Sequence, residues 1–135
     1  MGYLKNELSG KSKYFLSKHR YLELKHFCLQ YPEWKKRLRE LDGMKAGGLI
    51  FSENVEWADG TGRIGIERAE LSSKIELVEQ MARKAEPALA GYIMLCVTEG
   101  RTYPQMQALM CVPCGKNMFY DRYRKFFWLL DKEKI

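Results

Sequence analysis

Two cysteines near the C-terminal end of the chain, Cys111 and Cys114, have the Cys-X-X-Cys spacing of zinc ligands and redox-active dithiols. A zinc site would need two more ligands from the scattered remaining cysteines and histidines, and the sequence has no second Cys-X-X-Cys motif. A redox site would need a preceding strand in a thioredoxin-like context, which the pattern does not indicate. We therefore predict neither a metal nor a cofactor. Cys111 should pack in the core, and Cys114 should occupy a helix N-cap with a somewhat acidic thiol.

Other residues capable of acid–base or phosphate chemistry are isolated from one another. His19 and His26 are seven positions apart, which predicts two positions on one helix surface. The Asp-Gly-Thr-Gly run that begins at Asp59 lacks the lysine and the flanking strand and helix of a phosphate-binding loop. One acidic set should form a solvated helix side without an apolar cleft around it. This set is Glu67, Glu70, Glu76 and Glu79. We predict that the protein is not an enzyme.

One segment combines residue types in a pattern that favours DNA binding. A helix from about Gly115 to Asp131 would bury an aromatic side and leave cationic and amide side chains on the opposite side. Such side chains reach base edges in the major groove and neutralise phosphates. The predicted buried residues are Phe119, Tyr123, Phe126 or Phe127, and Leu130. The predicted DNA-binding residues are Lys116, Asn117, Tyr120, Arg122, Arg124 and Arg101.

Two shorter helices should position this segment, so that residues from about Glu86 to Leu130 form a helix-turn-helix unit. The first helix should run from about Pro87 to Val97, with Gly100 as its C-cap residue. Thr102 should cap the second helix, which should run from about Tyr103 to Met110. Val112 is the expected apolar turn residue, and Pro113 prevents the second helix from continuing. The second helix should turn Met106, Leu109 and Met110 towards the core.

The rest of the chain is also expected to be helical, apart from a glycine-rich loop. Apolar spacing predicts helices from Tyr14 to about Gln30, from Pro32 to Leu41 with a stop at Gly43, and from Ile66 to Ala85. In the last of these, Leu71, Ile75, Val78 and Ala82 form one stripe, and Glu70 should pair with Lys74. The predicted fold is all-α, with about six helices.

Three parts follow from this organisation. Residues 1–43 should form a basic helical pair after a mobile start of about twelve residues. Residues 44–65 should form the glycine-rich loop, in which Leu49–Trp57 is the one candidate strand. Residues 66–135 should hold the long helix and the helix-turn-helix unit. The core predicted for the first pair is Tyr21, Leu24, Phe27, Cys28, Trp34, Leu38 and Leu41.

Composition limits the classes of protein to which the chain can belong. A hydrophobic fraction of 46% in 135 residues is enough for a real core. No apolar run approaches the ~18 residues of a membrane span, and the N-terminus does not resemble a secretory signal. Four cysteines without such a signal predict a reducing compartment, the cytoplasm.

Charge is divided unevenly along the chain. The net charge is +6 for residues 1–50, −4 for residues 51–100 and +4 for residues 101–135. Two basic ends therefore flank an acidic middle, and the basic ends favour a polyanionic partner. A second basic cluster precedes the glycine-rich loop, and it offers either extra phosphate contacts, a contact with RNA polymerase or a merely solvated helix face. This cluster is Lys35, Lys36, Arg37 and Arg39.

The C-terminal segment TEGRTYPQMQALMCVPCGKNMFYDRYRKFFWLL resembles the tail of small proteins encoded by phages and prophages of Gram-positive bacteria. In these proteins a short helix, an apolar-Pro-Cys turn and a helix rich in Arg, Tyr and Phe end in a Phe-Trp-Leu-Leu-like run. The N-terminal segment LQYPEW is similar to their LQYNEW-type stretch, whereas the glycine-rich middle matches poorly. Some proteins of this plan are late-gene transcription regulators with a helix-turn-helix like that of sigma region four. The resemblance implies a DNA-binding regulator, and helical geometry selects the DNA-facing residues.

Two other functions remain open at this stage. A DNA-packaging accessory resembling small terminase subunits would keep duplex DNA as the partner, and multimeric rings would favour it. A protein-interaction module would instead dock its basic helices on an acidic protein. The stripe from Leu71 to Ala82 would serve either as a homodimer contact or as an intramolecular packing surface. The sequence does not specify the DNA site that would be recognised.

Overall fold

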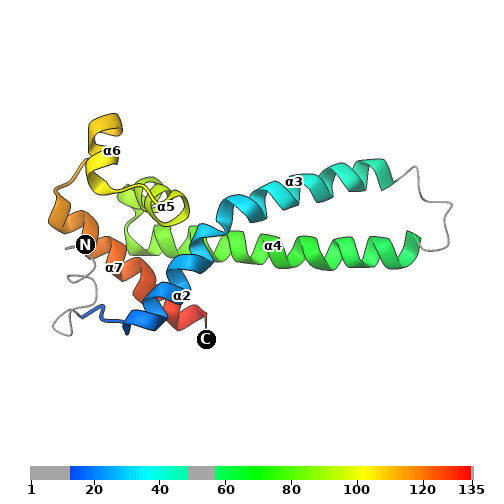
Figure 1. Ribbon diagram of the computed structural model, residues 1–135, viewed down its shortest axis with the longest axis horizontal. Coiled ribbons are helices and arrows are strands. Elements are labelled where there is room, and N and C mark those ends of the chain that lie inside the picture. Colours follow the sequence, from blue (N-terminus) through cyan, green and yellow to red (C-terminus); the bar gives the residue numbers. More distant parts are fainter. Residues whose placement is uncertain (1–12, 49–56, 135) are drawn as a thin grey trace. The chain divides into compact units, whose positions relative to one another are not determined.

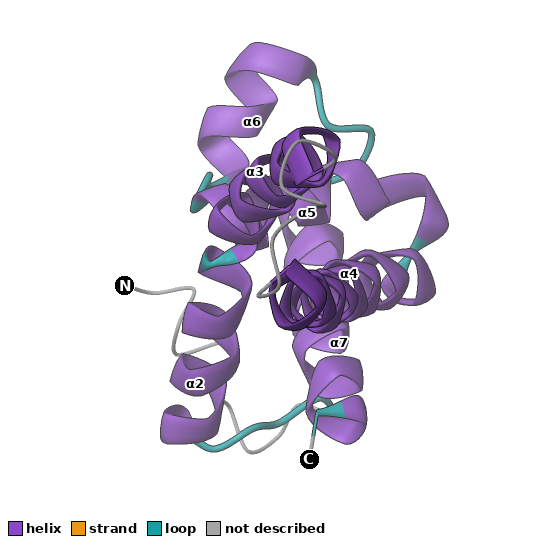
Figure 2. Ribbon diagram, turned by 90° about the vertical axis from the view of Figure 1, so that its right-hand side faces the viewer, coloured by secondary structure: helices purple, strands orange, loops and turns teal. Residues whose placement is uncertain are grey.

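A computed structural model describes residues 13–48 and 57–134, and every regular element among them is helical (Figure 2). The all-α fold is therefore confirmed for this part of the chain. The α-helices, labelled in Figure 1, are α2 (Lys18–Leu29), α3 (Tyr31–Gly48), α4 (Trp57–Ala85), α5 (Ala90–Glu99), α6 (Tyr103–Met110) and α7 (Lys116–Glu133), and the 3₁₀ turn η2 (Pro87–Leu89) lies between α4 and α5. The mobile start predicted for about the first twelve residues lies outside the described residues, as does most of the candidate strand.

The helices belong to two compact units. One unit comprises α2, α4 from Leu77 onward, η2, α5, α6 and α7. The other unit, Tyr31–Glu76, comprises α3 and the preceding part of α4.

In the α3–α4 unit, ion pairs join two antiparallel helices. Arg37 donates from Nε and Nη2 to the two carboxylate oxygens of Glu67, at 2.7 and 3.0 Å. Nearer the end of α3, Asp42 accepts from Nε of Arg68 at 2.8 Å. The planar guanidinium of Arg37 meets both carboxylate oxygens, which is the stronger geometry for such a pair. These exposed pairs contribute modestly to the register of the helices, which run side by side in Figure 1.

The predicted glycine-rich loop is partly helical. Helix α3 does not stop at Gly43 but continues to Gly48, and α4 begins at Trp57, so the Asp59–Gly62 run is helical rather than a turn. Extending an existing helix adds one hydrogen bond for each residue fixed, whereas starting a helix is unfavourable. The glycines in these extensions cost about 1 kcal/mol each in helix propensity. This loss of helix propensity does not end either helix.

In the larger unit, α7 supplies most of an aromatic core. Phe119, Phe126 and Leu130 are fully buried, and Phe127 is 1% exposed. Helix α2 packs against both α5 and α7. The ring of Tyr21 from α2 contacts Phe127 with centroids 5.3 Å apart. The predicted inward residues of α7 are therefore confirmed, with both Phe126 and Phe127 inside.

The helix ends around α6 are as predicted. Gly100 adopts the left-handed conformation (φ 72°) that a helix C-cap favours. Thr102 accepts from the Gln105 backbone N–H, and the Gln105 side chain accepts from the Thr102 N–H. This reciprocal capping box begins α6 at Tyr103.

The predicted core is confirmed in most helices and wrong at one end of α6. The stripe Leu71, Ile75, Val78 and Ala82 is buried, as are Tyr21, Leu24, Cys28, Trp34, Leu41 and Met106. Phe27 and Leu38 are half-buried. Leu109 is 72% exposed and Met110 is 36% exposed, although their spacing places them on the same side of α6 as buried Met106, so the packing of this side does not extend to the last turn. The predicted Glu70–Lys74 pair is absent from the ion pairs of the described residues; Nζ of Lys74 lies 5.7 Å from the ring centroid of Trp34.

Candidate functional site

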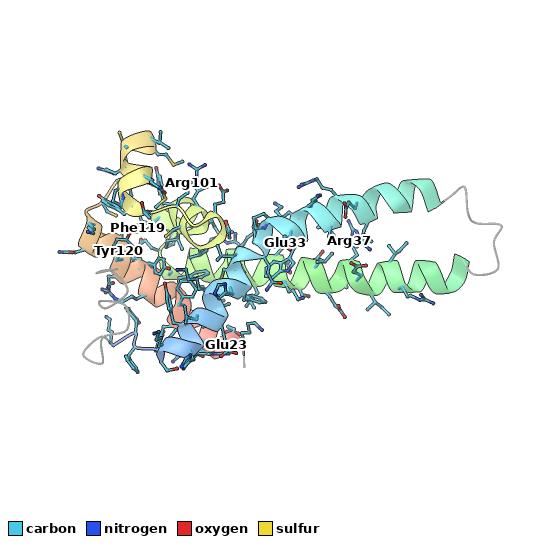
Figure 3. The ribbon with its side chains drawn as sticks, viewed as in Figure 1. Glu23, Glu33, Arg37, Arg101, Phe119 and Tyr120 are labelled. Carbon is cyan, nitrogen blue, oxygen red and sulfur yellow. The ribbon has the colours of Figure 1, made fainter. Side chains whose placement is uncertain are left out.

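Tyr103, the first residue of α6, holds α6, the following turn and α7 together. Its hydroxyl donates to the backbone carbonyl of Cys114 at 2.7 Å, and its backbone N–H donates to the hydroxyl of Tyr120 at 3.2 Å. Its ring centroid lies 5.7 Å from that of Phe119. Figure 3 labels Phe119 and Tyr120 on the part of α7 that lies nearest α6. Val112, the predicted turn residue, is 5% exposed and confirms the apolar anchor of the turn.

The two cysteines of the turn do not have the predicted positions. Cys111 is exposed and is the left-handed C-cap of α6 (φ 52°) rather than a core residue. The N-cap of α7 is Gly115 rather than Cys114, because the helix begins one residue later than a Cys114 cap requires. Burial raises the pKa of the Cys114 thiol, and Arg122 lowers it by a smaller amount. The predicted acidic thiol is therefore wrong.

The beginning of α7 is open to solvent. Lys116 and Asn117 are exposed, as the sequence predicted for a DNA-facing surface. Gly115 provides no side-chain cap, and the first turn carries no acidic residue. The positive end of the helix dipole and the Lys116 ammonium group therefore create a locally positive surface.

The six buried residues of α7 define which of its sides faces outward. With 3.6 residues per turn, Asp121, Lys125, Trp128 and Lys132 lie opposite the buried side, and Asn117 lies at the edge of this outward side. Asn117 and Lys132 are exposed, and Asp121 and Lys125 are half-buried. The outward face is thus rotated from the predicted one, which passed through Tyr120 and Arg124.

Tyr120 is not on the outward face. Its side chain is 7% exposed, and its hydroxyl accepts the Tyr103 N–H. The ring also contacts Phe119 and Tyr123 edge to face. This residue belongs to the packing between α6 and α7, so its assignment as a DNA-facing side chain is corrected.

Arg122 is occupied by two carboxylates. Its Nε donates to Glu86 at 3.0 Å, and its Nη1 donates to Asp121. The hydrogen bond to Glu86 is the main reason that the pKa of Arg122 is raised. A guanidinium group held in this way is not presented to a ligand.

Arg124 is also largely covered, with 18% of its side chain exposed. Its Nη2 lies 3.9 Å from Oδ1 of Asp121, and its buried Nε has no hydrogen-bond partner among the described residues. Asp121 therefore lies beside both arginines of α7. The sequence places Asp121 next to them but does not show this shared pairing.

Arg101 lies apart from α7, in the connection between α5 and α6 (Figure 3). Its Nε is 3.3 Å from Oε1 of Glu99, and both side chains are more than one third exposed. An exposed pair of this kind is weak. Of the predicted residues, Lys116 and Asn117 therefore share one exposed surface, and Arg101 lies on another segment.

Sequence reasoning missed two residues that border this surface. Met118 is 45% exposed beside Asn117, and half-buried Lys125 lies about two turns further along α7. Neither Lys116 nor Lys125 has an ion pair with any other described residue. The spacing of the aromatic residues could have identified Lys125, since it lies opposite their mean direction. We call Lys116, Asn117, Met118 and Lys125 the α7 surface; Lys116 is exposed at the beginning of the helix, on the opposite side of its axis from Lys125.

The other constellations that the sequence contains remain dispersed. His19 and His26 are exposed on α2, and Glu67 pairs with Arg37. Within residues 13–48 and 57–134, no three His, Cys, Asp or Glu side chains lie together in a way that could hold a metal ion. No helix in the described part of the chain is both long and apolar enough to cross a membrane.

In the α3–α4 unit, the predicted basic cluster is only partly available. Lys35, Lys36 and Arg39 are exposed, and Nζ of Lys35 lies 5.5 Å from the ring centroid of Tyr31. Arg37 is paired with Glu67 and Glu40.

The chain matches no protein-family model, no curated protein and no solved structure.

Proposed function

We propose that the protein binds duplex DNA through the α7 surface and acts as a transcription regulator of the type that phages encode. The observation that carries the proposal is the exposed beginning of α7, which presents the Lys116 ammonium group and the Asn117 amide without a neighbouring acidic residue in the first turn. A cation contacts phosphate, and an amide reads base edges in the major groove.

The packing of α6 supports this proposal. Helix α6 and the five residues that follow it precede α7 directly, and Tyr103 links all three segments. In helix-turn-helix proteins a short helix likewise braces the recognition helix, whose N-terminal residues contact base edges. Burial of Phe119, Tyr120 and Tyr123 would keep the rotation of α7 fixed as it enters a groove.

The corrected positions of Arg122 and Arg124 change the proposed contacts. Lys116 and Lys125 contact phosphate, and Asn117 contacts base edges. Arg122 and Arg124 support α7 from within the protein through Asp121 and Glu86. Two lysines provide few phosphate contacts, so we expect moderate affinity for DNA of random sequence.

The direct test is fluorescence anisotropy of the full chain with random-sequence duplexes, measured at about 50 and 200 mM salt. Binding that weakens as the salt concentration rises is the expected result. An absence of binding at the lower salt concentration would contradict the proposal.

Exposed apolar side chains favour a second candidate, a protein-interaction module. Leu109 and Met110 at the end of α6 are exposed in the segment that leads to α7. Exposed apolar residues that cluster on a surface often mark protein contacts. Two results together would favour this function over DNA binding. The full chain would capture RNA polymerase but bind no duplex, and a Leu109→Ser variant would lose the capture.

A further inference from the structure

The side chains of α7 differ in their hydrogen-bonding groups, and these groups determine which base pairs they can read. Guanine is most often read by an arginine whose guanidinium fork meets O6 and N7 together. Both arginines of α7 are engaged elsewhere, Arg122 with Glu86 and Asp121, and Arg124 beside Asp121 with 18% of its side chain exposed. A free guanidinium fork is therefore missing from the described residues of α7.

Cytosine is read by a carboxylate that accepts from its N4 amino group. Asp121 is the one acidic residue on the first half of α7, and its two oxygens face Arg122 and Arg124. Turning this carboxylate towards a base would remove a partner from each arginine, one of which already has a buried Nε without an acceptor. Leaving a buried charged donor unpaired is costly. The structure thus disfavours cytosine readout at this position.

Asn117 and Met118, which are consecutive in the sequence, are exposed and carry neither a guanidinium group nor a carboxylate. The exposed Asn117 amide has the groups that adenine requires, since its NH₂ can donate to N7 and its oxygen can accept from the N6 amino group. Met118 is 45% exposed and carries a flexible apolar chain, which can contact the 5-methyl group of thymine. Lys116 is a compact charge that we assign to a phosphate, although a lysine can also meet O6 and N7 of guanine.

We infer that Asn117 and Met118 are specificity-determining residues that select A·T pairs, with Asn117 reading adenine and Met118 contacting a thymine methyl group. This inference rests on the proposed function and adds the class of base pair to it. Lys116 and Lys125 then supply affinity that is independent of sequence.

The test begins with duplexes selected from a random library by the full chain. In the selected duplex, thymine is replaced by deoxyuridine, which lacks the methyl group, or adenine by 7-deazaadenine, which lacks the N7 acceptor. Deoxyuridine at the contacted position should weaken wild-type binding about fourfold, the value of one buried methyl group. 7-Deazaadenine should weaken it about five- to tenfold, since one of two hydrogen bonds is lost.

Variants assign each effect to a side chain. Met118→Ala should remove the sensitivity to deoxyuridine and keep the sensitivity to 7-deazaadenine, and Asn117→Ala should do the reverse. Both residues are exposed, so neither substitution removes a core contact. Gln80→Ala, an exposed amide on α4, is the matched control and should keep both sensitivities.

Different outcomes separate the inference from the proposed function. Salt-dependent binding without a selected motif, or a motif of G·C pairs that Asn117→Ala does not affect, would overturn the inference and leave DNA binding intact. Failure of the full chain to bind any duplex would overturn both.

Discussion

Nε of Arg122 in α7 donates a hydrogen bond at 3.0 Å to Oε1 of Glu86, the residue between α4 and η2. Both side chains are less than one third exposed, so solvent screens the pair only partly. The pair links the middle of α7 to the end of α4 within one compact unit. Arg122 is thus a structural residue of α7, although its position in a cationic segment predicts a DNA contact.

Replacing Arg122 should therefore lower stability more than it lowers DNA affinity. Arg122→Ala removes the partner of Glu86 and leaves Asp121 with Arg124 alone, and it should reduce the free energy of unfolding by about 1 kcal/mol. Urea denaturation followed by circular dichroism measures this change, with Lys84→Ala on exposed α4 surface as the control. Unchanged stability together with weaker salt dependence of DNA binding would instead assign Arg122 to the interface.

The tyrosine pair between α2 and α7 should contribute a measurable coupling. The hydroxyls of Tyr21 and Tyr123 lie 2.8 Å apart and are buried. Tyr21→Phe, Tyr123→Phe and the double variant form a thermodynamic cycle with an expected coupling free energy of about 1 kcal/mol. Strictly additive losses in urea denaturation would show that the two hydroxyls do not stabilise each other.

The left-handed backbone at Cys111 predicts a stabilising substitution. A residue with a Cβ atom is strained at a φ of 52°, whereas glycine adopts this conformation readily. Cys111→Gly should raise the free energy of unfolding by about 0.5 to 1 kcal/mol, after the larger entropy of glycine in the unfolded chain is subtracted. Cys111→Ala removes the thiol but keeps the strain, and it is the control. If the free energy of unfolding of Cys111→Gly is no higher than that of Cys111→Ala, the left-handed C-cap is contradicted.

The pairing of Arg37 with Glu67 predicts a dependence on acid. Hydrogen bonds from Arg37 hold the pKa of Glu67 below its ordinary value, since they favour the charged carboxylate. A group with a lowered folded-state pKa stabilises the fold above its unfolded pKa, and the stabilisation is lost as the pH falls through the folded-state pKa. NMR titration of the Glu67 carboxyl carbon should give a low midpoint that returns towards the ordinary value in Arg37→Gln. Equal midpoints in the two proteins would show that the pair does not form in solution.

Local patterns in the sequence predict most of the fold. Apolar spacing identifies the buried stripe of α4 and the inward residues of α7, and Thr102 and Gly100 identify the ends around α6. These features depend on residues within one or two turns of each other. The extent of α3 and α4 is not predicted, because single glycines weaken a helix without always ending it.

The candidate site is predicted only in part, because the positions of two of its residues depend on contacts distant in sequence. Lys116 and Asn117 are exposed at a helix beginning that local rules identify. The burial of Tyr120 follows from Tyr103, seventeen positions earlier, and the engagement of Arg122 follows from Glu86, thirty-six positions earlier. Amphipathic spacing alone does not distinguish an arginine that faces solvent from one that meets a carboxylate of another helix.

The salt dependence of duplex binding by Lys116→Ala and Lys18→Ala tests the role of the α7 surface most directly. Each variant removes one exposed lysine, but Lys18 begins α2, whose Arg20 pairs with Asp131 near the other end of α7. With Lys116→Ala, the slope of log affinity against log salt should become shallower by about one unit, and with Lys18→Ala it should stay unchanged. Equal slopes for wild-type protein and Lys116→Ala would contradict the assignment of DNA binding to the beginning of α7.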